Sequence, residues 1–385
     1  MVKLNIHCPH FNTCSGCIYN DIKSDPKIFK KAKIYLEKVL NDSIELKKSN
    51  AKHWRTRAKL AVRKNTSDPK KPLIGLFEEG THRVIPIPHC QIHHPKINEA
   101  IELMVSEFQK RDLTFYDEDA HTGDLRYIQL IVERRTNKVL LCFVVSFEET
   151  SEKKQQWESF AKILFENPIW HSIWMNFQPL KTNVIFGPTT RHIVGPRDIW
   201  ENICNNEIAF GPVHFGQANL EMFEKLLETI RKHIPRNKNV LELYAGAGSI
   251  GLSVLDLCNT ITFFERDKNA LQLFEKSKAH INPFLQQRIS YHIDISENAH
   301  EYIKNAEVVI VDPPRKGLSK NVLQSIVSSS TVDELIYISC DFETFERDAR
   351  QLWKEQKGFY LEKAFCFLFF PGSNHIETLG FFKRK

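Results

Sequence analysis

The apolar and polar positions follow three successive patterns along the chain. Residues 1–22 show no regular period, whereas over about 26–40 apolar residues recur at helical spacing and predict an amphipathic helix with a basic outer face. From about residue 50 the pattern changes to short β-type runs, such as 58–63 and 127–132, which turn clusters separate. One helix is expected near 96–110 within this β-rich region.

From about residue 217 to the end, helical and strand-like segments alternate. Such alternation predicts an α/β fold built on a mostly parallel, doubly wound sheet. We therefore predict two parts, a β-rich region over 1–210 and an α/β region over 211–385. The helix over about 26–40 is a candidate to pack on the second part.

Length and charge narrow the class of protein. With 385 residues and 42% hydrophobic positions, the chain is too long for one ordinary core and has enough apolar side chains for two or three. No apolar run reaches bilayer length and no signal-peptide core is present, so we expect a cytoplasmic protein. Residues 1–71 carry 17 Lys and Arg against 6 Asp and Glu. This local basic excess predicts a nucleic-acid partner, with a solvated basic face as the alternative.

The nine cysteines need an explanation, because disulfides are rare in the cytoplasm. Four of them have apolar neighbours and are expected in the core, namely Cys142, Cys204, Cys258 and Cys366. Cys8, Cys14 and Cys17 form a C-x5-C-x2-C cluster, and the only other nearby candidate is Cys90. Four such thiolates are able to hold either a [4Fe–4S] cluster or a tetrahedral zinc, and two neighbouring histidines keep zinc open.

Three apolar runs end in groups that carry chemistry. The run 334–340 ends in Cys340, the run 308–311 leads into Asp312, and the run 240–244 leads into a Gly-rich turn. The carboxyl ends of parallel strands meet at one edge of a doubly wound sheet, where ligands bind. These runs therefore outline a site with a cofactor and a nucleophilic thiol.

The Gly-rich turn 244–249 precedes a predicted helix and lets a ligand approach the backbone closely. Glu265 ends the following strand, where its carboxylate is suited to accept the two ribose hydroxyls of a nucleoside. This pair favours an adenosine-containing cofactor, and NAD stays an alternative because Gly251 completes a G-x-G-x-x-G pattern. The rigid Asp-Pro-Pro-Arg loop 312–315 favours a planar base lying against it, which a dehydrogenase does not need.

With these motifs the chain resembles the RNA uracil-5-methyltransferases that use S-adenosylmethionine. It resembles in particular the bacterial 23S rRNA branch, which carries an iron–sulfur cluster, and it has no room for a TRAM-type barrel before Cys8. The resemblance covers nearly the whole chain through the cysteine quartet and the stretches 53–59, 82–84, 215–219, 244–249, 312–315, 338–340, 370–371 and 375–378. The tRNA-specific branch is a poorer match because it lacks the cysteine quartet.

The resemblance implies a Rossmann-like S-adenosylmethionine methyltransferase domain and a β-rich RNA-binding domain with a four-cysteine cluster. It implies that Cys340 adds to C6 of a uracil and that Glu377 later removes the C5 proton. The implied cofactors are S-adenosylmethionine, bound by Gln217, Tyr244, Ser249, Glu265 and Asp312, and a [4Fe–4S] cluster on Cys8, Cys14, Cys17 and Cys90. The expected partner is RNA, most of all 23S rRNA, and the expected state is a monomer.

Two positions depart from the family pattern. Asp341 and Phe342 follow the nucleophile where the family usually has Asn-Pro, and we expect the added carboxylate to raise the pKa of the Cys340 thiol. Gly216 stands before Gln217 where an aromatic residue is common.

The basic N-terminal third is expected to bind the RNA around an extruded uridine, with Trp54, Arg55 and Arg57 as stacking and phosphate contacts. Three alternatives stay open. The first is a tRNA uracil-5-methyltransferase, the second is a methyltransferase that acts on an exocyclic amine, and the third is a non-catalytic RNA-binding protein with a decayed site. The identity of the modified uridine does not follow from the sequence.

Overall fold

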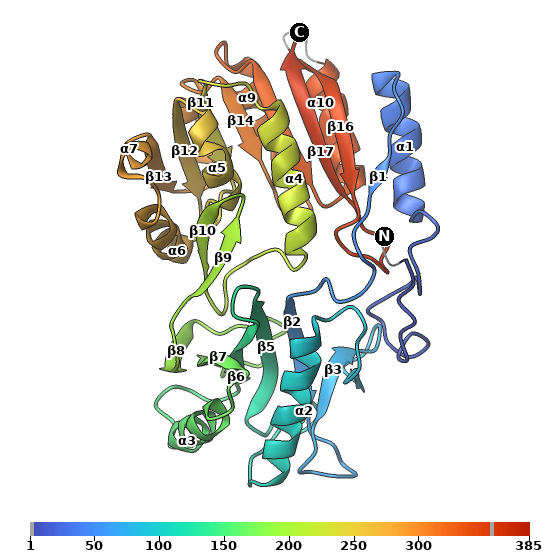
Figure 1. The fold of residues 1–385 in the computed structure, drawn as a ribbon, viewed down its shortest axis with the longest axis vertical. Coiled ribbons are helices and arrows are strands. Elements are labelled where there is room, and N and C mark those ends of the chain that lie inside the picture. The colour runs from blue at the N-terminus through green and yellow to red at the C-terminus, as the bar shows by residue number, and fades with distance from the viewer. Residues whose placement is uncertain (1–3, 355–357) are drawn as a thin grey trace.

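The computed structural model describes residues 4–354 and 358–385. Two sheets dominate it, an eight-stranded sheet in the upper half of Figure 1 and a seven-stranded sheet in the lower half. A β-hairpin of β9 (Ile199–Ile203) and β10 (Asn206–Phe210) lies between them. In the part of the chain that is described, no helix is long and apolar enough to cross a bilayer.

The eight-stranded sheet has the order β1-β16-β17-β15-β14-β11-β12-β13. Its strands are β1 (Leu46–Lys47), β11 (Asn239–Leu243), β12 (Thr260–Glu265), β13 (Ile289–Ile293), β14 (Val308–Val311), β15 (Glu334–Ser339), β16 (Phe359–Phe367) and β17 (Glu377–Arg384). Strands β11 to β15 run parallel, and β17 runs antiparallel to both of its neighbours. The predicted α/β fold with a mostly parallel doubly wound sheet is confirmed.

Helices cover both faces of this sheet. Successive side chains of its central strands point to opposite faces and are mostly apolar, so both faces have to be buried. Val240 packs toward one helical layer and Leu241 toward the other. The first layer includes α4 (Leu220–His233), α5 (Ser249–Val254) and α6 (Lys268–Ala279). The second includes α1 (Lys27–Leu40), α9 (Lys320–Ser328) and α10 (Phe342–Lys354). Short helices α7 (Pro283–Gln286), α8 (His300–Ile303), η1 (Leu255–Leu257) and η2 (Ser296–Asn298) complete this region.

The seven-stranded sheet has the order β4-β3-β2-β5-β6-β7-β8. Its strands are β2 (Arg57–Arg63), β3 (Leu73–Phe77), β4 (Val84–Pro86), β5 (Leu125–Glu133), β6 (Lys138–Val145), β7 (Trp170–Phe177) and β8 (Thr189–Val194). Helices α2 (Pro95–Gln109) and α3 (Lys153–Phe165) pack on one face of it and bury the largest apolar cluster. The middle of the chain is therefore β-rich, as predicted, but it contains a second helix, α3, that the sequence analysis did not predict.

The N-terminal segment crosses from one sheet to the other. Helix α1 buries Phe29, Ala32 and Leu36 against the eight-stranded sheet, and the two residues of β1 pair in parallel with β16. The cysteine-containing residues before α1 contact the core of the seven-stranded sheet. The division of the chain at residue 210 stays a prediction.

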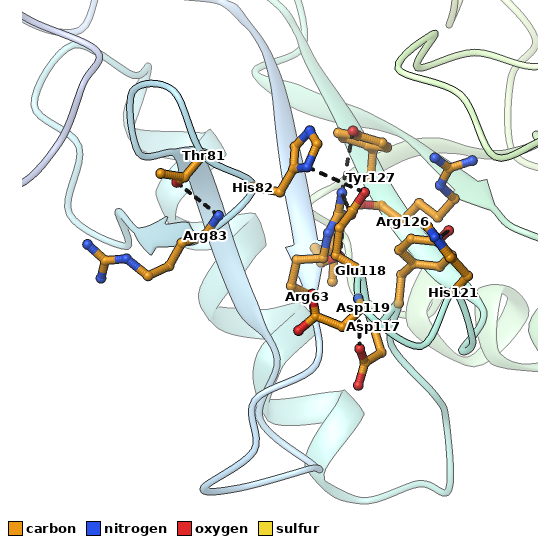
Figure 2. A network of polar contacts seen from close by, with 12 residues as sticks. Arg63, Thr81, His82, Arg83, Asp117, Glu118, Asp119, His121, Arg126 and Tyr127 are labelled. Carbon is orange, nitrogen blue, oxygen red and sulfur yellow. Dashed lines mark hydrogen bonds and ion pairs between the residues drawn. The ribbon is translucent and has the colours of Figure 1, made fainter.

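At one end of the β-rich sheet, Arg63 connects strands β3 and β5 to the loop that carries Tyr116 and Glu118 (Figure 2). Its guanidinium lies about 5 Å from the ring centres of Phe77, Tyr116 and Tyr127, and it forms a 2.6 Å ion pair with Glu118. Only 5% of Arg63 is exposed, so the aromatic rings and the carboxylate together replace its hydration. This network fixes the ends of the central strands β2 and β5 and lies apart from the strand ends that carry the predicted site.

Candidate active site and cysteine cavity

The parallel strands bring the predicted reactive residues to one edge of the eight-stranded sheet, the edge that faces the β-rich sheet. Tyr244 follows β11, Glu265 ends β12, Asp312 follows β14 and Cys340 follows β15. Glu377 opens β17, whose Thr378 pairs with Ser339 of β15. The pairing of these two strands sets the carboxylate of Glu377 beside the thiol of Cys340.

Two adjoining cavities lie at this edge. The first, of about 260 Å³, is lined by all five residues predicted to bind the cofactor, namely Gln217, Tyr244, Ser249, Glu265 and Asp312. The second, of about 650 Å³, is lined by Cys340 and Glu377, by the loop Asp312–Arg315, and by Arg55, Arg57 and Lys59 from the β-rich sheet. Gln217 and Asp312 line both cavities, so a ligand in the first lies next to a ligand in the second.

The Gly-rich turn is held open by left-handed backbone conformations. Tyr244 has φ 61°, Gly246 has φ 54° and Gly248 has φ 77°. A Cβ at Gly248 would press on the ring of Phe274, so both conformation and space require glycine there. The carboxylate of Glu265 accepts a 2.8 Å hydrogen bond from the Gly246 N–H, which ties the turn to the neighbouring strand.

Glu242 is a buried acid that the sequence analysis missed. It lies in β11 with 1% of its surface exposed, and its Oε2 accepts a 2.7 Å hydrogen bond from the Gly251 N–H. Its other oxygen has no partner among the described residues. Burial, followed by the carboxylates of Asp312 and Glu265, raises its pKa well above the usual range. A carboxylate within an otherwise apolar strand was the available signal.

Three acidic groups meet around the second cavity. Burial raises the pKa of Cys340 to about 11, and the carboxylates of Glu377 and Asp312 add to the shift, whereas Arg315 opposes it. Burial also raises the pKa of Asp312 to about 7, and it raises the pKa of Glu377 well above its usual range. Glu377 is only 4% exposed. Its carboxylate is therefore a stronger base than an exposed one.

Asp341 does not act on the thiol as predicted. Its Oδ1 accepts a 2.8 Å hydrogen bond from the Thr344 N–H and so caps the first turn of α10. The carboxylates that raise the pKa of Cys340 are those of Glu377 and Asp312. The side chain that replaces the family's asparagine thus has a structural role at the start of a helix.

The guanidinium of Arg57 is bound by groups of the protein. Its Nη2 donates to the carbonyl oxygens of Gly211 and His214, at 3.2 and 3.3 Å, and its guanidinium lies 5.5 Å from the ring centre of Phe210. Burial lowers its pKa to about 10. A Cβ at Gly216 would overlap the same guanidinium. Arg57 therefore fixes the loop that carries Gln217 to the cofactor cavity, and because it also lines the second cavity, its contact with RNA stays a prediction.

Arg55 separates the reaction cavity from a smaller cavity of about 150 Å³, since it lines both. The smaller cavity is also lined by the four predicted ligands Cys8, Cys14, Cys17 and Cys90. Burial and the other three thiols raise the pKa of Cys17 to about 12. Among the described residues, no three His, Cys, Asp or Glu side chains are close enough to hold a single metal ion.

Of the cysteines expected in the core, Cys142, Cys258 and Cys366 are buried and Cys204 is half-buried.

Comparison with known proteins shows the family of this chain. An uncharacterized RNA methyltransferase of Protochlamydia amoebophila is 37% identical over 388 residues, which span 99% of this chain and 98% of the relative. The family model described as tRNA (Uracil-5-)-methyltransferase matches residues 286–385. The chain belongs to the RNA uracil-5-methyltransferase family. A second RNA methyltransferase, from Halalkalibacterium halodurans, is 26% identical across 100% of this chain and 84% of its own length.

The fold of this RNA methyltransferase has a solved counterpart. The tRNA (uracil-54, C5)-methyltransferase of Pyrococcus abyssi, in complex with S-adenosyl-L-homocysteine, superposes with a TM-score of 0.77 at 20% identity. The likeness covers 96% of this chain and 86% of that one. The S-adenosylmethionine-dependent methyltransferase fold predicted from the sequence is therefore confirmed.

Proposed function

We propose that this RNA methyltransferase transfers a methyl group from S-adenosylmethionine to C5 of a uridine through a covalent adduct with Cys340. The observation that carries the proposal is the pairing of β15 with β17, which sets a half-buried thiol and a buried carboxylate on one cavity. That cavity adjoins the one lined by the five residues expected to bind the cofactor. When bound there, S-adenosylmethionine supplies an electrophilic methyl group.

Two residues carry out the reaction, Cys340 as the nucleophile and Glu377 as the base. C5 of uracil is a poor nucleophile, and addition of the Cys340 thiolate to C6 moves electron density onto C5 so that it is able to take a methyl group. The adduct then carries both a proton and a methyl group at C5. Glu377 removes this proton, and the electrons of the C5–H bond expel the thiolate. The raised pKa of Glu377 suits it to this step.

Charged side chains around the Cys340 thiol act on its pKa in opposite directions. Arg315 lowers the pKa of Cys340, whereas Asp312 and Glu377 raise it. A carboxylate that binds a proton no longer opposes the thiolate. Proton uptake by Asp312, whose pKa is about 7, therefore favours ionisation of Cys340 at neutral pH.

We propose 23S rRNA as the substrate, on the strength of the cysteine quartet that the resemblance ties to the rRNA branch. The alternative is tRNA, which both the matched family description and the Pyrococcus abyssi enzyme name. Mapping 5-methyluridine in rRNA and tRNA from a strain that lacks the gene separates the two. Loss of 5-methyluridine from tRNA alone would contradict the rRNA assignment.

The four cysteines are proposed to hold a [4Fe–4S] cluster, because all four line one cavity beside Arg55. Their thiolates would provide the complete ligand set of such a cluster. Neither reaction step above moves electrons to or from the protein, so the cluster's role is to hold residues 8–17 against the β-rich sheet. Zinc is the alternative occupant.

The decisive test of the function is methyl transfer with tritiated S-adenosylmethionine and RNA from the deletion strain. We expect tritium in 5-methyluridine, and we expect 5-fluorouracil-substituted RNA to form a denaturation-resistant adduct with the protein. Label in a base methylated on an exocyclic amine, without any adduct, would show a different reaction. A protein that binds RNA but transfers no label would be the non-catalytic alternative.

A further inference from the structure

The reaction cavity, the one of about 650 Å³ that Cys340 and Glu377 line, has a wall rich in cations. The residues that line it from the β-rich sheet include Arg55, Arg57 and Lys59 and, in the described part of the chain, no acid. Cys340 and Glu377 lie across from them, at the edge of the eight-stranded sheet. A base that reacts at this edge leaves the phosphates of its strand to the wall with the cations.

Two of the three cations are already bound by groups of the protein. Arg57 donates to two backbone carbonyl oxygens. The guanidinium of Arg55 lies 4.9 Å from the ring centre of Trp54 and donates a 3.4 Å hydrogen bond to the Arg57 carbonyl oxygen. The ammonium of Lys59, in contrast, has no hydrogen bond and no ion pair within residues 4–354 and 358–385. Lys59 is therefore the cation of this wall that is left for a ligand.

An aromatic ring holds the Lys59 ammonium without neutralising it. The nitrogen lies 5.2 Å from the ring centre of Phe186. A ring attracts a cation through its quadrupole but, unlike a carboxylate, brings no opposite charge. Burial, followed by the charge of Arg57, lowers the pKa of Lys59, which is the direction expected of a cation without an anionic partner. The pair thus presents an uncompensated positive charge to the cavity.

Phe186 belongs to the loop 178–188, which joins β7 to β8 and folds back over the sheet. There it packs beside Ala61 and Tyr127, on the face opposite the helices α2 and α3. Three buried polar side chains donate hydrogen bonds to backbone carbonyls of this loop, namely Arg126, Asn176 and Gln178. These contacts fix Phe186, and through it the position of the Lys59 ammonium.

We infer that Lys59 binds a phosphate that flanks the target uridine, and that Phe186 is the positioning residue for its ammonium. The inference rests on the proposed function in one respect, that the uridine reacts at Cys340. Contacts of this kind set the register of a nucleic-acid strand on a protein. Lys59 therefore helps to place one particular nucleotide in the reaction cavity.

Two other anions come near this wall, and the structure favours neither as the partner of Lys59. The cofactor carries a carboxylate, but Lys59 does not line the cofactor cavity. The cysteine cavity is lined by both Lys59 and Arg55. Of these two, Arg55 is the cation that faces the thiols, because burial lowers its pKa while Cys90 and Cys17 raise it.

The test uses the full-length protein and a fluorescein-labelled RNA of twelve nucleotides, all cytidines except one central 5-fluorouridine. Lys59→Gln should weaken binding, measured by anisotropy, about tenfold. It should also lower the slope of log affinity against log salt by about 0.7. Lys59→Arg should restore both. Phe186→Leu keeps an apolar side chain but removes the ring, so it should weaken binding less and add nothing to Lys59→Gln. The matched control is Lys162→Gln, an exposed cation on α3.

A change in the RNA separates a phosphate contact from a purely structural role of Lys59. Methylphosphonates in place of the two phosphates that flank the 5-fluorouridine remove their charge. This change should weaken binding of the wild type about tenfold more than binding of Lys59→Gln. Equal losses, or a salt slope of Lys59→Gln equal to that of Lys162→Gln, would overturn the inference. Loss of S-adenosylhomocysteine binding or of iron in Lys59→Gln, with RNA affinity unchanged, would overturn it as well.

The same RNA distinguishes this inference from the proposed reaction. With S-adenosylmethionine, the wild type should form a denaturation-resistant adduct through Cys340. If the wild type forms no adduct while Lys59→Gln shows the lowered salt slope, the proposed reaction fails and the phosphate contact stands.

Discussion

Substitution of Gly216 by alanine tests how the cofactor loop is held. The backbone of Gly216 is not in the left-handed region, so alanine is compatible with its conformation. The obstacle is the Arg57 guanidinium, which an added Cβ would overlap. Arg57 would have to leave the carbonyl oxygens of Gly211 and His214. The loop from Gly211 to Gln217 would then lose its main polar attachment to β2.

The expected size of the effect follows from these two hydrogen bonds. A hydrogen bond to a charged group contributes about 1.5–3 kcal/mol. Both bonds come from one nitrogen and exceed 3 Å, so we expect about 2 kcal/mol for the pair. Expressed as affinity for S-adenosylhomocysteine, which the loop reaches through Gln217, this is about a 30-fold loss.

A double-mutant cycle read by calorimetry separates this mechanism from a general disturbance. Gly216→Ala and Arg57→Ala release the same loop, so the double variant should bind S-adenosylhomocysteine no more weakly than either single variant. Lys59→Ala is the control, because Lys59 lines the same cavity from the same strand and contacts Phe186 instead of the loop. Its effect should add to that of Gly216→Ala. Additive losses for Gly216→Ala and Arg57→Ala would refute the reasoning.

Two further predictions concern the thiol and the cysteines. Since the pKa of Cys340 is about 11, adduct formation with 5-fluorouracil RNA should rise with pH between pH 6.5 and 8.5, and by less than tenfold per unit near pH 7, where Asp312 loses its proton and its charge opposes the thiolate. Arg315→Gln removes the cation that lowers this pKa and should slow adduct formation at every pH in that range; an unchanged or faster rate would contradict the electrostatic account. Anaerobically purified protein should be brown with about four iron atoms per chain, and Cys90→Ser should lose iron and melt at a lower temperature while any folded fraction still forms the adduct. Stoichiometric zinc without iron would contradict the cluster assignment.

The parts of the site that lie in sequence motifs were predictable, and the parts made by distant contacts were not. The ends of β11, β12, β14 and β15 were marked by residues that do not belong in apolar strands, and parallel strands bring such ends together. Helix α3 also had a usable signal, because Trp157, Phe160 and Leu164 recur at helical spacing, but its polar first turn hid the helix among β-type runs.

The role of Arg57 shows what local pattern does not contain. In the sequence it is one of several basic residues in the N-terminal third. Its partners, the carbonyl groups of Gly211 and His214, lie more than 150 positions away. Backbone carbonyls leave no mark on the sequence, and the glycine that makes room for the guanidinium looked like a weakness of the cofactor motif. Asp341 was misjudged for a related reason, because a helix cap and a charge beside a thiol have the same sequence signature.

The most direct test of the account is the fate of Glu377→Gln with tritiated S-adenosylmethionine and RNA from the deletion strain. Glutamine keeps the shape of the side chain but cannot remove the C5 proton, so Cys340 should add to the uridine, C5 should become methylated, and elimination should stall. We predict a denaturation-resistant RNA–protein adduct that contains tritium and maps to the peptide bearing Cys340, and its absence in Cys340→Ala. Normal turnover of Glu377→Gln without any adduct would contradict the assignment of nucleophile and base.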